Sequence, residues 1–377
     1  MRGNKMKITN QTITLKDGRE VTLYALANDN GTTATVATYG GILVSVTTPD
    51  RDGHISDVVC GYRLEDFDYY TEADGYLGAL VGRVANRICK GKFTLDGTTY
   101  DNLYINNNDN HLHGGKEGFS NKIWTVEGMT EEEDRVSLTL AYTSVDGEEG
   151  YPGTLSVKVT YALNNDGALS LHYIATTDKA TPINLTNHAY FNLGGYDKGD
   201  VLDHGLWLEA ESYLPTDEGL IPTGEIKPVD GTPFDFRETK AIGEDFYADN
   251  QDLKLAGGYD HCFNFKGWQD CKSGGNVQVR GYVYDPKSGR DMTLLTNQPC
   301  VQVYSANFLK NPAYPLRGSE IGDHNTYPQK TQHALCLETQ MMPDSINHEG
   351  FTDCILRPGE VYDFTTVYVF STDYEGE

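Results

Sequence analysis

Residues 181–193 read TPINLTNHAYFNL and show the two-residue alternation of a β-strand. From Ile183 onward the odd positions are apolar except at Asn187, so they predict a side that packs against a core. The even positions share the opposite side, which carries no Asp, Glu, Lys or Arg. They are Asn184, Thr186, His188, Tyr190 and Asn192. Neutral hydrogen-bonding groups suit a neutral, hydroxyl-rich ligand. The alternative is an antiparallel strand whose polar side faces water, with His188 as a surface residue.

The rest of the chain repeats this short, strand-like pattern. Its 377 residues contain 40 Gly, scattered singly between short apolar runs, and no linker, low-complexity tract or internal repeat interrupts them. Residues 13–15, 21–26, 32–38 and 39–46 read as strands, with a hairpin turn at 50–53. Residues 64–72 are the one modest helical candidate. The sequence therefore predicts an all-β protein, a large antiparallel β-sandwich, in a single domain over residues 1–377.

Charge and cysteine usage restrict the partners and the compartment. The formal net charge of −25 disfavours nucleic acid, anionic membranes and polyanionic substrates. The cysteines are odd in number, widely spaced and free of any Cys-x-x-Cys pair, which predicts buried free thiols in a reducing compartment; they are Cys60, Cys89, Cys262, Cys271, Cys300, Cys336 and Cys354. Residues 1–12 lack an apolar core of signal-peptide length, and no run reaches transmembrane length. We expect a cytoplasmic protein.

Several short motifs carry residues suited to sugar chemistry. Residues 82–88 read GRVANRI, 110–115 NHLHGG, 257–261 GGYDH, 299–308 PCVQVYSANF and 334–340 ALCLETQ. Arg87 offers donors in a rigid fork that can bridge neighbouring hydroxyls, although an isolated Arg more often forms a structural ion pair. Asp260 taken alone is an ordinary turn residue. Glu338 lies at the end of an apolar strand, where partial desolvation raises the pKa of a carboxylate and makes it a better base than an exposed Glu.

Metal binding is the main alternative for the histidines at 111 and 113. Two His one residue apart can both ligate a metal, but no further cysteine or carboxylate stands at a recognisable motif spacing. We therefore expect neither a metal nor a cofactor.

In order and spacing, these motifs and the 181–193 stretch resemble the aldose 1-epimerases, the galactose mutarotases, over nearly the whole chain. The resemblance implies the supersandwich form of the β-sandwich. It also implies that Asn86, Arg87, His113, Asp260 and Gln302 contact the sugar and that His188 and Glu338 are the catalytic pair. The sequence departs from the family pattern at Val303 and Ser305-Ala306, beside Gln302, and at 118–124.

The implied activity is interconversion of the α and β anomers of a free aldose such as glucose or galactose. We expect Glu338 to remove the anomeric hydroxyl proton while His188, kept cationic by nearby carboxylates, protonates the ring oxygen. The ring opens, the bond between C1 and C2 rotates, and the same pair closes it. Two other classes remain: a glycoside hydrolase using Asp260 with Glu338, and a sugar-binding module without catalysis.

Overall fold

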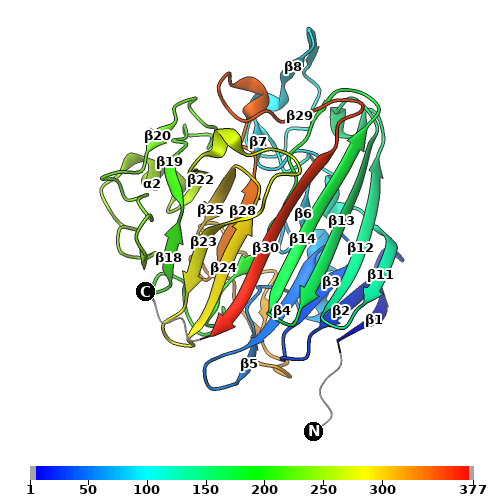
Figure 1. Cartoon of the computed structure of the whole chain (residues 1–377), viewed down its shortest axis with the longest axis vertical. Coiled ribbons are helices and arrows are strands. Elements are labelled where there is room, and N and C mark those ends of the chain that lie inside the picture. The colour runs from blue at the N-terminus through cyan, green and yellow to red at the C-terminus, as the bar shows by residue number, and fades with distance from the viewer. Residues whose placement is uncertain (1–5, 373–377) are drawn as a thin grey trace.

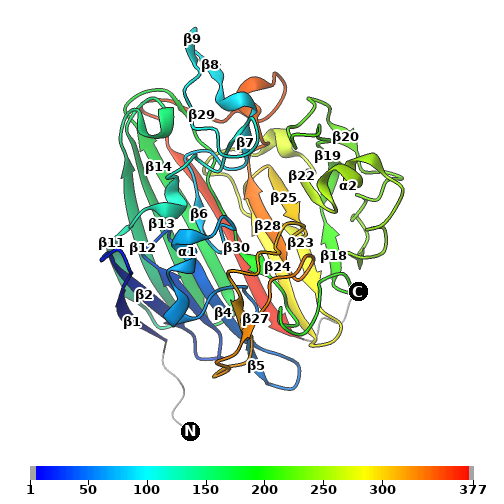
Figure 2. The same cartoon turned by 180° about the vertical axis from the view of Figure 1, so that it is seen from behind.

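The computed structural model describes residues 6–372 and consists mainly of antiparallel strands in three large sheets (Figures 1 and 2). The longest sheet has nine strands in the order β11 (Thr125–Glu131), β12 (Arg135–Ser144), β13 (Leu155–Asn164), β14 (Ala168–Thr177), β30 (Tyr362–Thr372), β24 (Arg290–Thr296), β23 (Gln278–Tyr284), β18 (Gly205–Leu208) and β21 (Lys240–Ala241). The expected all-β antiparallel sandwich is confirmed.

Two further sheets complete the sandwich. The second has six strands, β17 (Tyr190–Phe191), β28 (Leu335–Gln340), β25 (Cys300–Tyr304), β22 (Asp260–Phe265), β19 (Ala210–Tyr213) and β20 (Lys227–Pro228). The third follows chain order, β1 (Lys7–Thr14), β2 (Glu20–Ala27), β3 (Thr33–Ala37), β4 (Leu43–Pro49) and β5 (Ile55–Asp57).

Small elements join the sheets. Two-stranded pairs are β7 (Arg87–Ile88) with β10 (His111–Leu112), β6 (Leu80–Val81) with β16 (Thr186–Asn187), β15 (Thr181–Pro182) with β29 (Ile355–Leu356), β8 (Phe93–Leu95) with β9 (Thr98–Tyr100), and β26 (Leu316–Arg317) with β27 (Thr326–Tyr327). Short 3₁₀ turns are η2 (Cys89–Gly91), η3 (Phe119–Asn121), η4 (Glu148–Gly150), η5 (Trp268–Asp270) and η6 (Ser345–Asn347).

The apolar core includes residues of all three large sheets, and its part between the six-stranded and nine-stranded sheets positions β28. Strand alternation turns Leu335 and Leu337 inward, where they share one apolar cluster with Tyr368 and Phe370 of β30. The Tyr368 hydroxyl donates to the Leu337 carbonyl at 3.2 Å. Both cartoon views place β28 beside β30 (Figures 1 and 2). One face of β28 is thereby fixed in the core, and Glu338 points to the other.

The predicted continuous strand over 181–193 is wrong. Its three short pieces pair with three different partners: β15 with β29, β16 with β6, and β17 with β28. Asparagine side chains replace the missing ladder bonds, because Asn184 binds the backbone of Met341 in both directions and Asn187 donates to the Gly78 carbonyl. The alternation itself holds, since Ile183, Leu185, Ala189, Phe191 and Leu193 all lie in the core.

The helical prediction holds in part. Residues 64–72 form a 3₁₀ turn, η1 (Leu64–Asp66), and one α-turn, α1 (Tyr69–Glu72). A second helix, α2 (Gln251–Ala256), was missed. The Asn250 side chain caps it by accepting from the backbone N–H of Asp252 and Leu253, and Gly257, at φ +69°, ends it. Those two residues were the sequence signal for this helix.

Other local predictions are confirmed. Residues 50–53 form a turn between β4 and β5 in which Asp50 Oδ1 accepts from the backbone N–H of Asp52 and His54. All seven cysteines are free, and five of them are buried. Within residues 6–372, no helix has the length and apolar character needed to cross a membrane.

Candidate active site

A cavity of about 490 Å³ opens on the face of the six-stranded sheet, and the predicted catalytic pair lies on its wall. His188, in the bend between β16 and β17, places Nε2 3.6 Å from Glu338 Oε1 on β28. His188 is 5% exposed and Glu338 2%. Residues 150 positions apart in the chain thus lie side by side as one buried pair.

Backbone bonds fix His188 in this bend. Its N–H donates to the Ala79 carbonyl and its carbonyl accepts from the N–H of Gly78, at 2.9 Å each. Aromatic rings enclose the imidazole: Tyr190 is stacked at a centroid distance of 4.9 Å and Tyr76 at 6.1 Å. Both tyrosines line the cavity. From the sequence, Tyr190 was expected only on the polar side of residues 181–193, and Tyr76 had no predicted role. The stacked rings contribute to the burial of His188, which is 5% exposed.

Burial changes the titration of both groups. It lowers the pKa of His188 to about 4 and raises the pKa of Glu338 well above its usual range, with the negative charge of Asp260 adding to the second shift and Arg87 opposing it. The raised pKa of Glu338 was expected. The low pKa of His188 disagrees with the expected cationic His188, because desolvation disfavours the imidazolium. Both shifts favour a resting pair in which His188 is neutral and the proton is on Glu338.

Asn86 and Arg87 lie together on the cavity wall. Asn86, at φ +62°, accepts with Oδ1 from the Arg87 backbone N–H at 2.8 Å. The guanidinium Nε donates to Asn107 Oδ1 at 3.0 Å. Among residues 6–372, no carboxylate lies within ion-pair distance of Arg87, so the structural ion pair considered from the sequence is not present. Arg87 is the one cationic Arg or Lys of the lining, which also carries Asp74, Glu218, Asp260 and Glu338.

His113 is a fixed hydrogen-bond donor. The backbone N–H of Asn86 donates to His113 Nδ1 at 3.1 Å, and burial together with the nearby His188 lowers the pKa of His113 well below its usual value. A neutral ring whose Nδ1 accepts must carry its proton on Nε2. Its ring centroid lies 5.3 Å from that of His188, so this donor belongs to the same site.

The tautomer of His113 also decides the metal question. Ligand atoms of His113, His188 and Glu338 lie within 4.8 Å of one another, a spacing that suits a divalent metal. A metal-bound imidazole donates its second N–H to a neighbour, whereas His113 accepts at Nδ1 and holds a proton on Nε2. The three residues therefore do not fit a metal unless the bond from Asn86 breaks.

Asp260 reaches the cavity, but Gln302 lies behind it. Asp260, on β22, lines the wall and accepts from Gln302 Nε2 at 2.7 Å. Gln302, on β25, is 3% exposed and is not part of the cavity lining. The expected direct contact between Gln302 and a sugar is thus not favoured by its position.

The remaining polar residues of the motifs are structural. His111 is fully buried between the Tyr104 carbonyl and the Tyr151 hydroxyl, at 2.7 and 2.6 Å. Of the polar residues on the 181–193 stretch, only His188 and Tyr190 line the cavity, whereas Asn184 and Asn192 hold neighbouring backbone segments. The interpretation of this side as water-exposed is wrong as well, because all five residues are buried.

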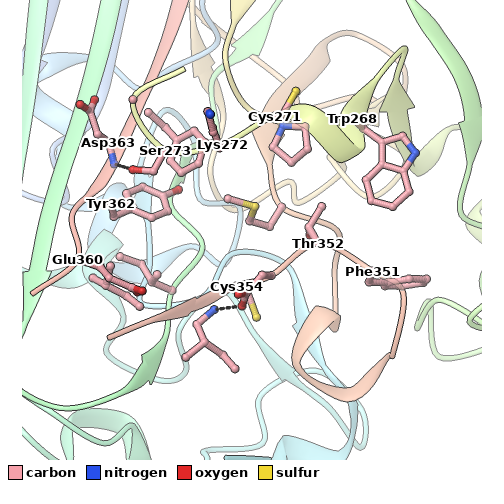
Figure 3. Close-up of a pocket in the computed structure, with 18 of the residues that line it drawn as sticks. Trp268, Cys271, Lys272, Ser273, Phe351, Thr352, Cys354, Glu360, Tyr362 and Asp363 are labelled. Carbon is pink, nitrogen blue, oxygen red and sulfur yellow. Dashed lines mark hydrogen bonds between the residues drawn. The ribbon is translucent and has the colours of Figure 1, made fainter. Parts of the chain in front are cut away.

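A larger cavity, of about 870 Å³, lies elsewhere, between η5, β29 and the start of β30 (Figure 3). Apolar and aromatic side chains, including Trp268, Phe351 and Tyr362, make up much of its wall. Its polar groups bond to each other, as where Ser273 Oγ accepts from the Asp363 N–H at 2.9 Å. Size alone would select this cavity, but it contains no buried acid-base pair.

A β-sandwich whose cavity holds a buried imidazole–carboxyl pair fits the class of acid-base isomerases expected from the sequence. The chain belongs to the aldose 1-epimerase family, whose model matches residues 22–369. It is 41% identical over 336 residues to human galactose mutarotase, covering 89% of this chain and 90% of that protein. It is 38% identical over 356 residues to the aldose 1-epimerase of Escherichia coli, covering 94% and 96%.

Solved structures agree with the sequence relatives. The fold superposes on galactose 1-epimerase from Lactobacillus acidophilus with a TM-score of 0.81 and 28% identity, covering 98% of this chain and 100% of that one. A homologue from Caenorhabditis elegans gives a TM-score of 0.80 at 31% identity, covering 93% and 98%. The expected class, an isomerase that interconverts aldose anomers, is confirmed, and nothing favours the hydrolase or the binding module.

Proposed function

We propose that His188 and Glu338 interconvert the anomers of a free, neutral hexose by exchanging two protons with it. The observation that carries this proposal is the 3.6 Å approach of His188 Nε2 to Glu338 Oε1 inside a buried cavity. The reaction needs one group to take the proton of the anomeric hydroxyl and one to give a proton to the ring oxygen. A pair at this spacing reaches both oxygens of one anomeric centre.

The proton count supports the same assignment. For ring opening, Glu338 accepts the O1 proton, the C1–O1 double bond forms as the C1–O5 bond breaks, and His188 gives its proton to O5. The pair starts and ends with one proton, which has moved from His188 to Glu338. The pKa shifts of the unliganded site favour the proton on Glu338, the arrangement required for ring closure. Ring opening needs the proton on His188 and an ionised Glu338. The positive charge of Arg87 favours this state because it stabilises the Glu338 carboxylate.

Asn86, Arg87, His113 and Asp260 are proposed as the sugar contacts. Arg87 and His113 supply donors, and Asp260 supplies an acceptor, so their arrangement matches a ring bearing hydroxyls on several carbons. With one cation against four carboxyls on the wall, a neutral sugar is favoured over a sugar phosphate.

Three broader proposals complete this assignment. Residues 1–377 form one domain, a proposal supported by an apolar cluster that runs from Met6 to Phe370 and includes residues of all three large sheets. The protein is cytoplasmic, as its seven free cysteines favour. Its partner is a monosaccharide and neither nucleic acid nor a membrane, as the net charge of −25 favours.

Polarimetry tests the activity directly. Freshly dissolved α-glucose and α-galactose should approach their equilibrium rotation faster in proportion to enzyme concentration. Rotation that changes no faster than in buffer would reject the proposal, and release of reducing sugar from a disaccharide would assign a hydrolase instead.

A further inference from the structure

Gln302 occupies the position between Asp260 and Glu338. Antiparallel register places Gln302 directly opposite Glu338, and residues paired in this way point to the same side of the sheet with their Cβ atoms about 4.5–5.5 Å apart. On its other side, the Gln302 amide donates from Nε2 to Asp260 Oδ1 at 2.7 Å. Gln302 thus lies behind the cavity wall, bonded to Asp260 and paired across the strands with Glu338.

The orientation of this amide follows from its bond to Asp260. The bond runs from Gln302 Nε2 to Asp260 Oδ1, so the NH₂ end of Gln302 faces Asp260 and the carbonyl end faces away. The remaining Gln302 Oε1 is buried and has no hydrogen-bond partner among residues 6–372. Glu338 Oε2 is likewise buried without a partner there. Two unpartnered oxygens on facing residues can bond to each other only when one carries a proton.

We propose that Gln302 is a positioning residue whose Oε1 accepts a hydrogen bond from the protonated carboxyl of Glu338, and that Asp260 holds the amide in the orientation this requires. The inference rests on the proposed function and deepens it. Such a bond stabilises the acid form of Glu338, the form that gives a proton to the aldehyde oxygen in ring closure. It also gives Asp260 a second task besides contact with the sugar.

Other groups around Glu338 bear on its titration. Arg87 from β7 opposes the protonated form, whereas Asp260 from β22 favours it and His188 faces it from the bend before β17. His113 also lies within 4.8 Å of Glu338, and burial lowers its pKa well below the usual value. Burial raises the pKa of four further neighbours, which stay neutral at pH 7: Tyr190, Tyr304, Cys336 and Tyr368. Among the groups around Glu338, Asp260 is the one bonded to Gln302. In this proposal Asp260 therefore acts on the pKa of Glu338 through the orientation of the Gln302 amide as well as through its charge.

The pH profile of kcat/KM separates this role from sugar binding. Gln302→Met keeps the length of the side chain and removes Oε1, so the upper limb of the profile should move down by about one pH unit, the size of one neutral hydrogen bond. Gln302→Glu keeps an acceptor and adds negative charge, so the upper limb should move up. Cys300→Ala, a matched control on the same strand and side, should leave the limb in place.

Two results would overturn the inference. A Gln302→Met enzyme with a raised KM and an unmoved upper limb would make Gln302 a sugar contact. An upper limb that moves up in Gln302→Met would mean that the amide donates to ionised Glu338. A wild-type protein without mutarotation would instead reject the proposed function.

A measurement without sugar or turnover keeps the two questions apart. Carbon-13 NMR titration of the Glu338 side-chain carboxyl, assigned by its loss in Glu338→Gln, should show a lower pKa in Gln302→Met than in the wild type. An equal or higher pKa would contradict the proposed bond whether or not the enzyme is active.

Discussion

The cavity beside Tyr362 and the cavity beside His188 differ in how their polar groups are satisfied. In the larger one, beside Tyr362, hydroxyl and backbone groups bond to one another, as between Ser273 and Asp363. In the smaller one, Glu338 Oε2 is buried without a partner among the described residues, and Glu338 and His188 both have pKa values shifted by burial. A buried polar atom without a partner raises the free energy of the folded protein. Its persistence beside a cavity indicates function better than cavity volume does.

The strongest test of this comparison removes the pair. Glu338→Gln and His188→Asn should each lower kcat by about a hundredfold to ten-thousandfold, since each removes one proton-transfer group. The double variant should lose little more than either single one, because the two groups act as a unit. Polarimetry measures the rates, and circular dichroism checks the fold.

A matched change in the larger cavity serves as the control. Cys354→Ala removes a buried thiol from its wall and should leave kcat within about twofold, because the thiol touches no group of the acid-base pair. Near-normal turnover in a folded Glu338 or His188 variant would remove that residue from the mechanism.

The pH dependence follows from the two shifted pKa values. Activity needs one proton on the pair. Below about pH 4, neutral His188 gains a proton while Glu338 keeps its own, so the base is lost. Above the raised pKa of Glu338 the pair loses its proton, so the acid is lost. The rate should form a bell centred in the weakly acidic to neutral range and fall about tenfold per pH unit beyond each limb.

The limbs belong to the pair and not to single residues, because the two groups titrate together. A rate that rises steadily with hydroxide across the whole range would contradict acid-base catalysis by this pair.

Substrate charge gives a smaller effect. Free glucose or galactose should have a specificity constant at least about tenfold above that of glucose 6-phosphate, since a phosphate bound at this wall would meet one Arg and four carboxyls. Competition in the mutarotation assay measures the ratio. A higher specificity constant for the phosphate would move the assignment to a hexose-phosphate epimerase.

The smallest expected effects concern the free energy of unfolding. Here the change in the larger cavity should have the greater effect, the reverse of what is expected for kcat. The Tyr362 hydroxyl accepts from the Leu185 N–H and from Gln298 Nε2, at 3.2 and 2.9 Å. Tyr362→Phe should lower the free energy of unfolding by about 1–3 kcal/mol, because it leaves two buried donors without an acceptor. Glu338→Gln should change it by less than about 1 kcal/mol at pH 7, where a protonated carboxyl is exchanged for an amide of the same shape.

Urea unfolding of both variants measures this difference. If Glu338→Gln proved the more destabilised of the two, the contrast between a functional and a structural cavity would fail.

Local sequence determined the features that depend on a few neighbouring residues. Alternation over 181–193 identified the apolar side of that stretch. Asp50 and the residues after it formed the predicted turn. Resemblance of short motifs identified six residues that line the cavity: Asn86, Arg87, His113, His188, Asp260 and Glu338. Backbone period and turn chemistry act within a few positions, so a linear reading captures them.

Tertiary packing decided distances, desolvation and proton positions. It divided 181–193 among three partner strands, brought His188 to Glu338 across 150 positions, and turned the expected imidazolium neutral by burial. It fixed the proton of His113 through the backbone of Asn86 and placed Gln302 behind Asp260. These properties depend on which distant segments exclude water from a group and which atoms they bring to it, and neither is a property of neighbouring residues in the chain.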